Sequence, residues 1–211
     1  MATSASPRAF DVRHLQLARA LFAAIAAVMV TFSSDHSAVV GLSVFSGFAL
    51  ATALTFALSA WLVFPRGQRA TVIALAVVSA VAGMAASVPS WRVTGAFFGI
   101  VIAWALVSGL IEVLSAVRDR RAGRTTAAPR DGLLIGILTL VLGAALIFTS
   151  PQFSLGYAIE GAGSFTLTGI VIAVGLFGGY AAVVAVFLAI AGFSPRRTEP
   201  SPAAPTEEVA S

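Results

Sequence analysis

Charged residues divide this sequence into six apolar runs, each long enough to cross a bilayer. The runs cover about residues 15–33, 39–63, 70–88, 95–117, 132–150 and 165–192, and polar or turn-forming segments separate them. A membrane-spanning helix needs roughly 20 mostly apolar residues. Only 10% of the 211 residues are charged, whereas a soluble domain has about 25%. The sequence therefore predicts an all-α membrane protein with six transmembrane helices.

The arginines indicate the direction in which these helices cross the membrane. The chain has thirteen basic residues, all of them Arg, and all but Arg92 fall on one side of the six-helix arrangement. Basic segments stay in the cytoplasm, so we expect both termini to be cytoplasmic, in the cell membrane of a bacterium. Residues 1–12 and 195–211 are predicted to be disordered tails that flank a transmembrane domain at 13–194, because neither could bury a core.

Four arginines crowd together after the fourth run. The basic residues occur in short blocks between apolar runs. This pattern is typical of segments that set the orientation of a membrane protein, rather than of a nucleic-acid-binding surface. We expect this block to contact the headgroups of anionic lipids. Its members are Arg118, Arg120, Arg121 and Arg124.

Internal similarity groups the six runs into three helical hairpins. The segments GIVIAWALVSG at 99–109 and GIVIAVGLFGG at 169–179 share seven of eleven residues, and FSGFALATAL at 45–54 is a weaker match. We therefore expect tandem hairpins at about 13–66, 69–118 and 130–194. Parallel repeats of this kind stack around an axis near the membrane normal.

Small residues recur at a spacing of four in several runs. Apolar burial does not drive helices together in lipid. The close approach of backbones at small residues therefore has to hold the helices together. We expect these positions to pack helices within one bundle. The alternative is association with a second copy of the chain or with another membrane protein. The glycines concerned are Gly47, Gly95, Gly99, Gly109, Gly175 and Gly179.

Glu112 lies in an otherwise apolar run, six residues before Arg118. This places it at the inner edge of the bilayer, and Arg19 lies at a matching depth in the first run. An unpaired charge in this layer costs a few kcal/mol, so we predict an Arg19–Glu112 ion pair between the first and fourth helices. The alternatives are a role of Glu112 in proton or ion handling, and an unpaired carboxylate that reaches water. Asp131 is expected to cap the fifth helix.

Catalytic and cofactor motifs are missing from the sequence. It has no Cys, no P-loop, no G-x-S-x-G and no H-E-x-x-H, so we expect no enzyme, no cofactor and no metal. The deeper polar residues do not form a proton relay. A small transporter or channel is the alternative function, and it requires a cavity near the midplane that reaches Glu112. The residues expected to line such a path are Trp104, Ser108, Thr139 and Tyr180.

A helix with several glycines, a G-x-x-E near its end and a basic loop, FFGIVIAWALVSGLIEVLSAVRDRRAGR, is followed by a helix with a central glycine and a terminal proline, DGLLIGILTLVLGAALIFTSP. Over residues 95–151, this pattern resembles the HdeD-like family of small six-helix bacterial membrane proteins. In FFGIVIAWALVSGLIEVLSAVRDRRAGR, Gly109 and Glu112 match the G-x-x-E of the family near the cytoplasmic end of a helix. In DGLLIGILTLVLGAALIFTSP, the residues that match the next helix of the family are Gly132, Gly136, Gly143 and Pro151. The first hairpin departs from the pattern because its first helix has little glycine. The resemblance implies repeated hairpins and a non-enzymatic role in acid or envelope stress tolerance.

Overall fold

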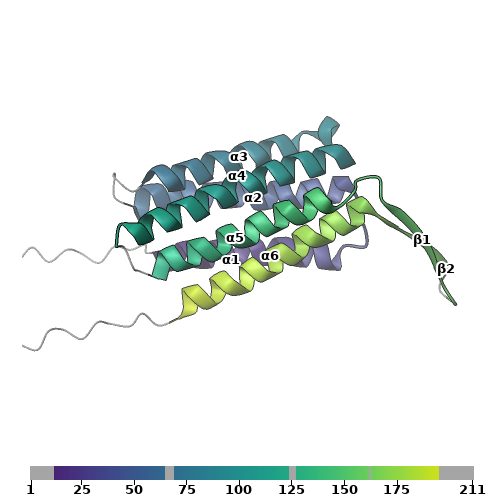
Figure 1. The fold of residues 1–211 in the computed structure, drawn as a ribbon. Helices are drawn as coiled ribbons and strands as arrows, with labels where there is room; N and C mark the ends of the chain where they lie inside the picture. The colour runs from purple at the N-terminus through teal and green to yellow at the C-terminus, as the bar shows by residue number, and fades with distance from the viewer. Residues whose placement is uncertain (1–11, 65–68, 124–126, 162, 195–211) are drawn as a thin grey trace, which may run out of the picture.

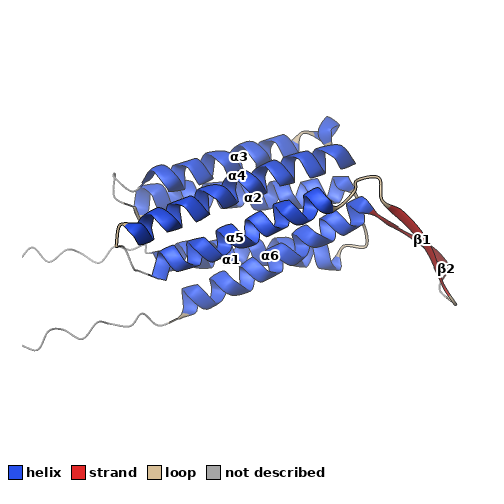
Figure 2. Cartoon of the chain, viewed as in Figure 1, coloured by secondary structure: helices blue, strands red, loops and turns tan. Residues whose placement is uncertain are grey.

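In the computed structural model, the chain forms six long helices and one β-hairpin (Figures 1 and 2). The structure describes residues 12–64, 69–123, 127–161 and 163–194, with backbone alone at 127–130. The helices are α1 Val12–Phe32, α2 Ala38–Leu62, α3 Arg69–Ser87, α4 Thr94–Arg121, α5 Ala127–Phe148 and α6 Gly169–Phe193. The strands are β1 Ser154–Ile159 and β2 Gly163–Thr168, and a 3-10 turn covers Pro89–Trp91.

All six of these described helices are long and apolar enough to span a bilayer. The chain is therefore a multi-pass membrane protein, and the expected all-α membrane fold is confirmed. Apart from Val12, the predicted disordered tails lie outside the described residues.

The helices form a ring in chain order. Each helix packs against the next one, and α6 returns to pack along α1. The most extensive contacts join α1 to α6, α2 to α3, and α4 to α5. Figure 1 shows that α1 begins and α6 ends at the same end of the bundle. We call this end the arginine end, because α3 begins there at Arg69 and α4 ends there at Arg121, and we call the opposite end the hairpin end.

Burial follows the same pattern in all three helical hairpins. Moving from α1 to α3, or from α2 to α4, buried residues recur 56 positions later, and from α3 to α5 they recur 60 positions later. From α4 to α6 the shift is 76, because the β-hairpin adds residues between α5 and α6. The helices are thus three equivalent pairs around a pseudo-threefold axis. One set of equivalent positions is Ala23, Ser79 and Thr139, and another is Phe48, Trp104 and Tyr180.

The eleven-residue match in the sequence does not follow this structural register. It aligns Gly99 with Gly169, yet Gly99 is exposed on α4 and Gly169 is buried at the start of α6. By burial, the position equivalent to Gly99 is Gly175, which is also exposed. The three tandem helix pairs are present. The alignment given by the eleven-residue sequence match is offset by six residues from the alignment given by burial.

The glycines expected to pack the helices mostly face away from the bundle. Of the six, Gly109 is in close contact, since a Cβ added there would lie 2.9 Å from the carbonyl oxygen of Gly136 in α5. At the other five, an added Cβ would meet nothing within 4 Å. The prediction of packing within the bundle is wrong for these five because their side of each helix points outward. They are Gly47, Gly95, Gly99, Gly175 and Gly179.

The segment between α5 and α6 is a β-hairpin that projects beyond the helix ends (Figure 1). β1 and β2 pair antiparallel, with Tyr157 opposite Phe165, and these two rings stack with centroids 5.8 Å apart. Gly161 and Gly163 have φ values of 82° and 97° at the tip, a conformation that glycine adopts most readily. Because β2 continues to Thr168, α6 begins at Gly169 rather than at 165.

Candidate functional site

A buried ion pair lies inside the arginine end of the bundle. A guanidinium nitrogen of Arg19, in α1, donates to Oε1 of Glu112, in α4, at 2.9 Å. The Glu112 side chain is 8% exposed and that of Arg19 is 16% exposed. The guanidinium also lies 4.5 Å from the centroid of the Phe56 ring in α2, which adds a cation–π contact. One arginine therefore links three helices.

Local contacts explain why Glu112 points inward. Its Cβ would lie 3.0 Å from a Cβ added at Gly136, so the backbones of α4 and α5 approach closely beside it. α1 and α4 are not neighbours in the ring, so Arg19 reaches Glu112 across the interior. A charge in this apolar layer requires a partner, and the long Arg side chain provides one.

A second polar link runs beside the ion pair. Nε2 of Gln16, in α1, donates to Oδ2 of Asp131, in α5, at 2.6 Å. Gln16 lies three residues before Arg19, so both side chains leave α1 on the same face. The sequence predicted that Asp131 caps the fifth helix. This is wrong, because α5 begins at Ala127 and Asp131 lies more than a turn inside it.

These two links lie in the wall of a cavity of about 240 Å³ at the arginine end. All six helices contribute to its lining. The polar lining residues are Gln16, Arg19, Thr71, Glu112, Ser115, Asp119 and Asp131, and the rest of the wall is mainly aliphatic and aromatic. The cavity therefore combines an apolar body with a few charged groups, as small-molecule sites commonly do.

The cavity lies on the pseudo-threefold axis, because equivalent residues of the three helix pairs line it together. The position of Glu112 is apolar in the other two pairs, and so is the position of Arg19. The first set is Phe56, Glu112 and Leu188, and the second is Arg19, Leu75 and Ile135. The ion pair is thus a departure from an otherwise apolar, repeated arrangement.

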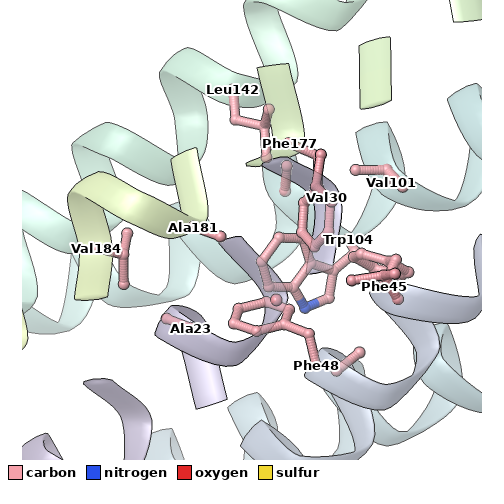
Figure 3. Close-up of a cluster of buried hydrophobic side chains, with 14 of the residues drawn as sticks. Ala23, Val30, Phe45, Phe48, Val101, Trp104, Leu142, Phe177, Ala181 and Val184 are labelled. Carbon is pink, nitrogen blue, oxygen red and sulfur yellow. The ribbon is translucent and has the colours of Figure 1, made fainter. Parts of the chain in front are cut away.

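Aromatic side chains pack together in the core of the bundle (Figure 3). On α2, α4 and α6 they lie nearer the hairpin end than the cavity residues Phe56, Glu112 and Leu188. Phe45 and Phe48 of α2 each meet Trp104 of α4 and Phe177 of α6 edge to face. Their ring centroids are 5.3 to 5.7 Å apart, within the range preferred by aromatic pairs. Phe45 and Phe177 are completely buried.

The four polar residues expected to line a transport path form hydrogen bonds within the bundle. Nε1 of Trp104 donates to Oγ of Ser79 at 3.3 Å, and the hydroxyls of Thr139 and Tyr180 are 2.9 Å apart. The hydroxyl of Ser108 donates to the Trp104 carbonyl at 2.5 Å. The cavity at the arginine end is lined by none of the four.

The remaining predicted residues lie on the surface or outside the described part of the chain. Arg118, Arg120 and Arg121 are exposed on the last turns of α4, whereas the prediction for Arg124 falls outside the described residues. No group of three His, Cys, Asp or Glu side chains that could hold a metal ion occurs among the residues that the structure describes.

Comparisons of the chain with protein families, with curated proteins and with solved structures find no match. The resemblance of residues 95–151 to the HdeD-like family therefore stays a prediction. The functional interpretation depends on the ion pair, the cavity and the packed aromatic layer.

Proposed function

We propose that the chain is a non-enzymatic multi-pass protein of the bacterial cell membrane that supports tolerance of acid or envelope stress. Its arginine end would face the cytoplasm, because basic segments are retained there. The proposal depends mainly on how the interior is used. Glu112 bonds to Arg19, Trp104 to Ser79 and Thr139 to Tyr180. The aromatic layer of Phe45, Phe48, Trp104 and Phe177 fills the space beyond the cavity. Relationship to the HdeD-like family is part of this proposal.

In this role, the Arg19–Glu112 pair joins the first helix pair to the second at the arginine end of the bundle. Breaking a buried pair by removing one partner typically costs about 3–5 kcal/mol, although the partial exposure of Arg19 lowers this figure. A compact bundle would resist unfolding when the envelope is acidified, and the exposed arginines would keep it against anionic headgroups.

Survival after an acid pulse tests the proposed role. A strain that lacks the gene should survive less well than its parent, and expression of the wild-type chain should restore survival. The double variant Arg19→Glu/Glu112→Arg should also restore it, because the pair is kept with its charges exchanged, whereas Glu112→Arg alone should not. Equal survival of the deletion strain and its parent would refute the stress role.

A small transporter or channel is the second candidate, and the cavity that reaches Glu112 favours it. Liposomes that contain the protein and an entrapped pH-sensitive dye distinguish the two functions. For an envelope protein, an imposed pH gradient should decay as slowly as in empty liposomes. Faster decay that disappears in Glu112→Gln would support the transporter instead.

A further inference from the structure

The β-hairpin places its apolar and its polar side chains on opposite faces. Successive residues of a strand point to opposite faces of a sheet, and every second residue of each strand is large and apolar. The register pairs these residues across the two strands on one face, which we call the apolar face. Its members are Leu155, Tyr157, Ile159, Phe165 and Leu167. The opposite face has small and hydroxyl side chains, at Ser154, Gly156, Ala158, Ser164, Thr166 and Thr168.

The helices leave the apolar face uncovered. Leu155, Tyr157, Ile159 and Phe165 are each 44 to 52% exposed. The hairpin is fixed at its base, where β2 contacts the start of α6 and the N–H of Gly169 donates to the Phe153 carbonyl at 2.8 Å. A single two-stranded hairpin is at best marginally stable in water. An apolar surface against this face would therefore stabilise the hairpin.

The place of the hairpin in the chain brings the membrane surface within its reach. β1 follows α5 and β2 leads into α6, and both helices are long and apolar enough to span a bilayer. The hairpin therefore begins where these helices leave the hydrocarbon. Figure 1 shows that it turns aside from the axis of α6 instead of continuing along it. Strands of six residues extend roughly 20 Å, which is enough to lie across the lipid beside the bundle.

The chemistry of the hairpin suits the boundary between lipid headgroups and acyl chains. Tyr side chains are enriched at this boundary, and Tyr157 lies in the middle of the apolar face. Glu160, in the turn, is the single charged residue of the sequence 154–168, so a partner recognised by charge is not favoured.

The backbone of the hairpin sets how deep it can lie. In the described part of the chain the sheet has two strands, so the outer edge of each strand presents N–H and C=O groups that pair with no other strand. Open edges of this kind do not occur in the hydrocarbon of a bilayer. At the headgroup level, water and headgroups can bond to both edges while the apolar side chains reach toward the acyl chains.

We propose that the β-hairpin is a membrane anchor that lies flat on the leaflet at the hairpin end of the bundle. Its apolar face lies against the lipid, and its hydroxyl-bearing face is turned to water. The partner is the phospholipid surface itself. This anchor depends neither on the proposed stress role nor on which end of the bundle is cytoplasmic, because it requires only the folded hairpin and a bilayer.

Site-specific labelling tests the proposal, since the chain has no cysteine and one introduced thiol carries one label. Ile159→Cys lies on the apolar face and Ala158→Cys on the opposite face, and both positions are exposed near the tip. Each variant carries an NBD fluorophore in nanodiscs that hold one copy of the protein. We expect nitroxide-labelled lipid to quench the label at 159 and aqueous iodide to quench the label at 158, with little quenching in the reverse combinations.

A second pair of variants needs no label. Chymotrypsin cleaves after aromatic residues, so it reports access to Tyr157 and Phe165. In the same nanodiscs, Ile159→Ser should be cleaved about tenfold faster than the wild type, as for loss of part of the burial of one large side chain. Ala158→Ser is the matched control and should be cleaved at the wild-type rate. The helices of both variants should melt as in the wild type.

The outcomes separate lipid from the other possible environments of the apolar face. Resistance of each labelled chain to chymotrypsin establishes that its hairpin is folded. In such chains, equal quenching of both labels by iodide would show that the hairpin stands in water and would overturn the proposal. Protection of the label at 159 from both quenchers would show that protein covers the face, which also overturns it. Equal cleavage of the two serine variants would do the same. None of these results depends on the acid-survival assay, so the two proposals can fail separately.

Discussion

Gly136 tests the contact that holds α4 and α5 together. A Cβ added at this position would lie 2.9 Å from both the backbone nitrogen and Cγ2 of Val113, and 3.0 Å from the Cβ of Glu112. Carbon atoms in ordinary contact are about 3.5–4.0 Å apart. The Gly136→Val variant therefore requires the two helices to separate by roughly 0.5–1 Å, since a backbone atom cannot rotate away.

The size of this effect can be isolated with a matched substitution. Overpacking of a dense interior costs about 1–3 kcal/mol, and we expect the upper end because Val adds two further carbons at a backbone contact. Gly99→Val has the same change in helix propensity, yet an added Cβ there meets nothing within 4 Å. For a chain of 150–250 residues, 1 kcal/mol shifts Tm by about 2–4 °C. Gly136→Val should thus melt about 6–12 °C below Gly99→Val.

Circular dichroism of the two variants in one detergent gives the comparison. A Gly99→Val variant that melts near the wild type beside a clearly less stable Gly136→Val variant would confirm the contact. Equal melting temperatures for the two variants would refute the close approach of α4 and α5. A less stable Gly99→Val would show that its side of α4 is covered after all.

Three further outcomes follow from other parts of the structure. Gly163→Val should disorder the β-hairpin, because φ of 97° costs a branched residue about 1–3 kcal/mol, so proteolysis within 154–168 should accelerate while the helices melt as before. Ser79→Ala removes the acceptor of the buried Trp104 Nε1 and should lower stability by about 1–2 kcal/mol, whereas an unchanged Tm would rule out that bond. Replacing Arg118, Arg120 and Arg121 by glutamine should weaken binding to anionic lipid. The measurement mixes the protein in nanodiscs with liposomes rich in anionic lipid and records the fraction that binds.

The helices could be predicted from the sequence because charges interrupt the apolar runs. Each of the six predicted runs overlaps its helix closely, apart from the end of α4 and the starts of α5 and α6. The β-hairpin had a usable signal that was missed. Leu155, Tyr157 and Ile159 alternate with small residues, and two glycines follow, which is the period of a strand and its turn.

The directions in which the glycines point could not be predicted. In a membrane protein, the side that faces lipid is as apolar as the side that faces another helix, so no polar face distinguishes them. Gly99 and Gly109 therefore look alike in sequence, although only Gly109 of these two contacts α5. The matching depths of Arg19 and Glu112 in the membrane were sufficient to predict their ion pair, because few charges lie in that layer. The Gln16–Asp131 bond was missed, since Gln16 is uncharged and Asp131 suggested a cap.

The most direct test of the central claim, that Arg19 and Glu112 hold the bundle together across its axis, is a charge-swap cycle. Unfolding stability would be measured for the wild type, Arg19→Glu, Glu112→Arg and the double variant in one detergent. We expect each single variant to lose about 3 kcal/mol, since each brings two like charges together in the buried layer, and we expect the double variant to recover most of that loss. Single variants as stable as the wild type, or a double variant as unstable as the sum of the two, would contradict the claim.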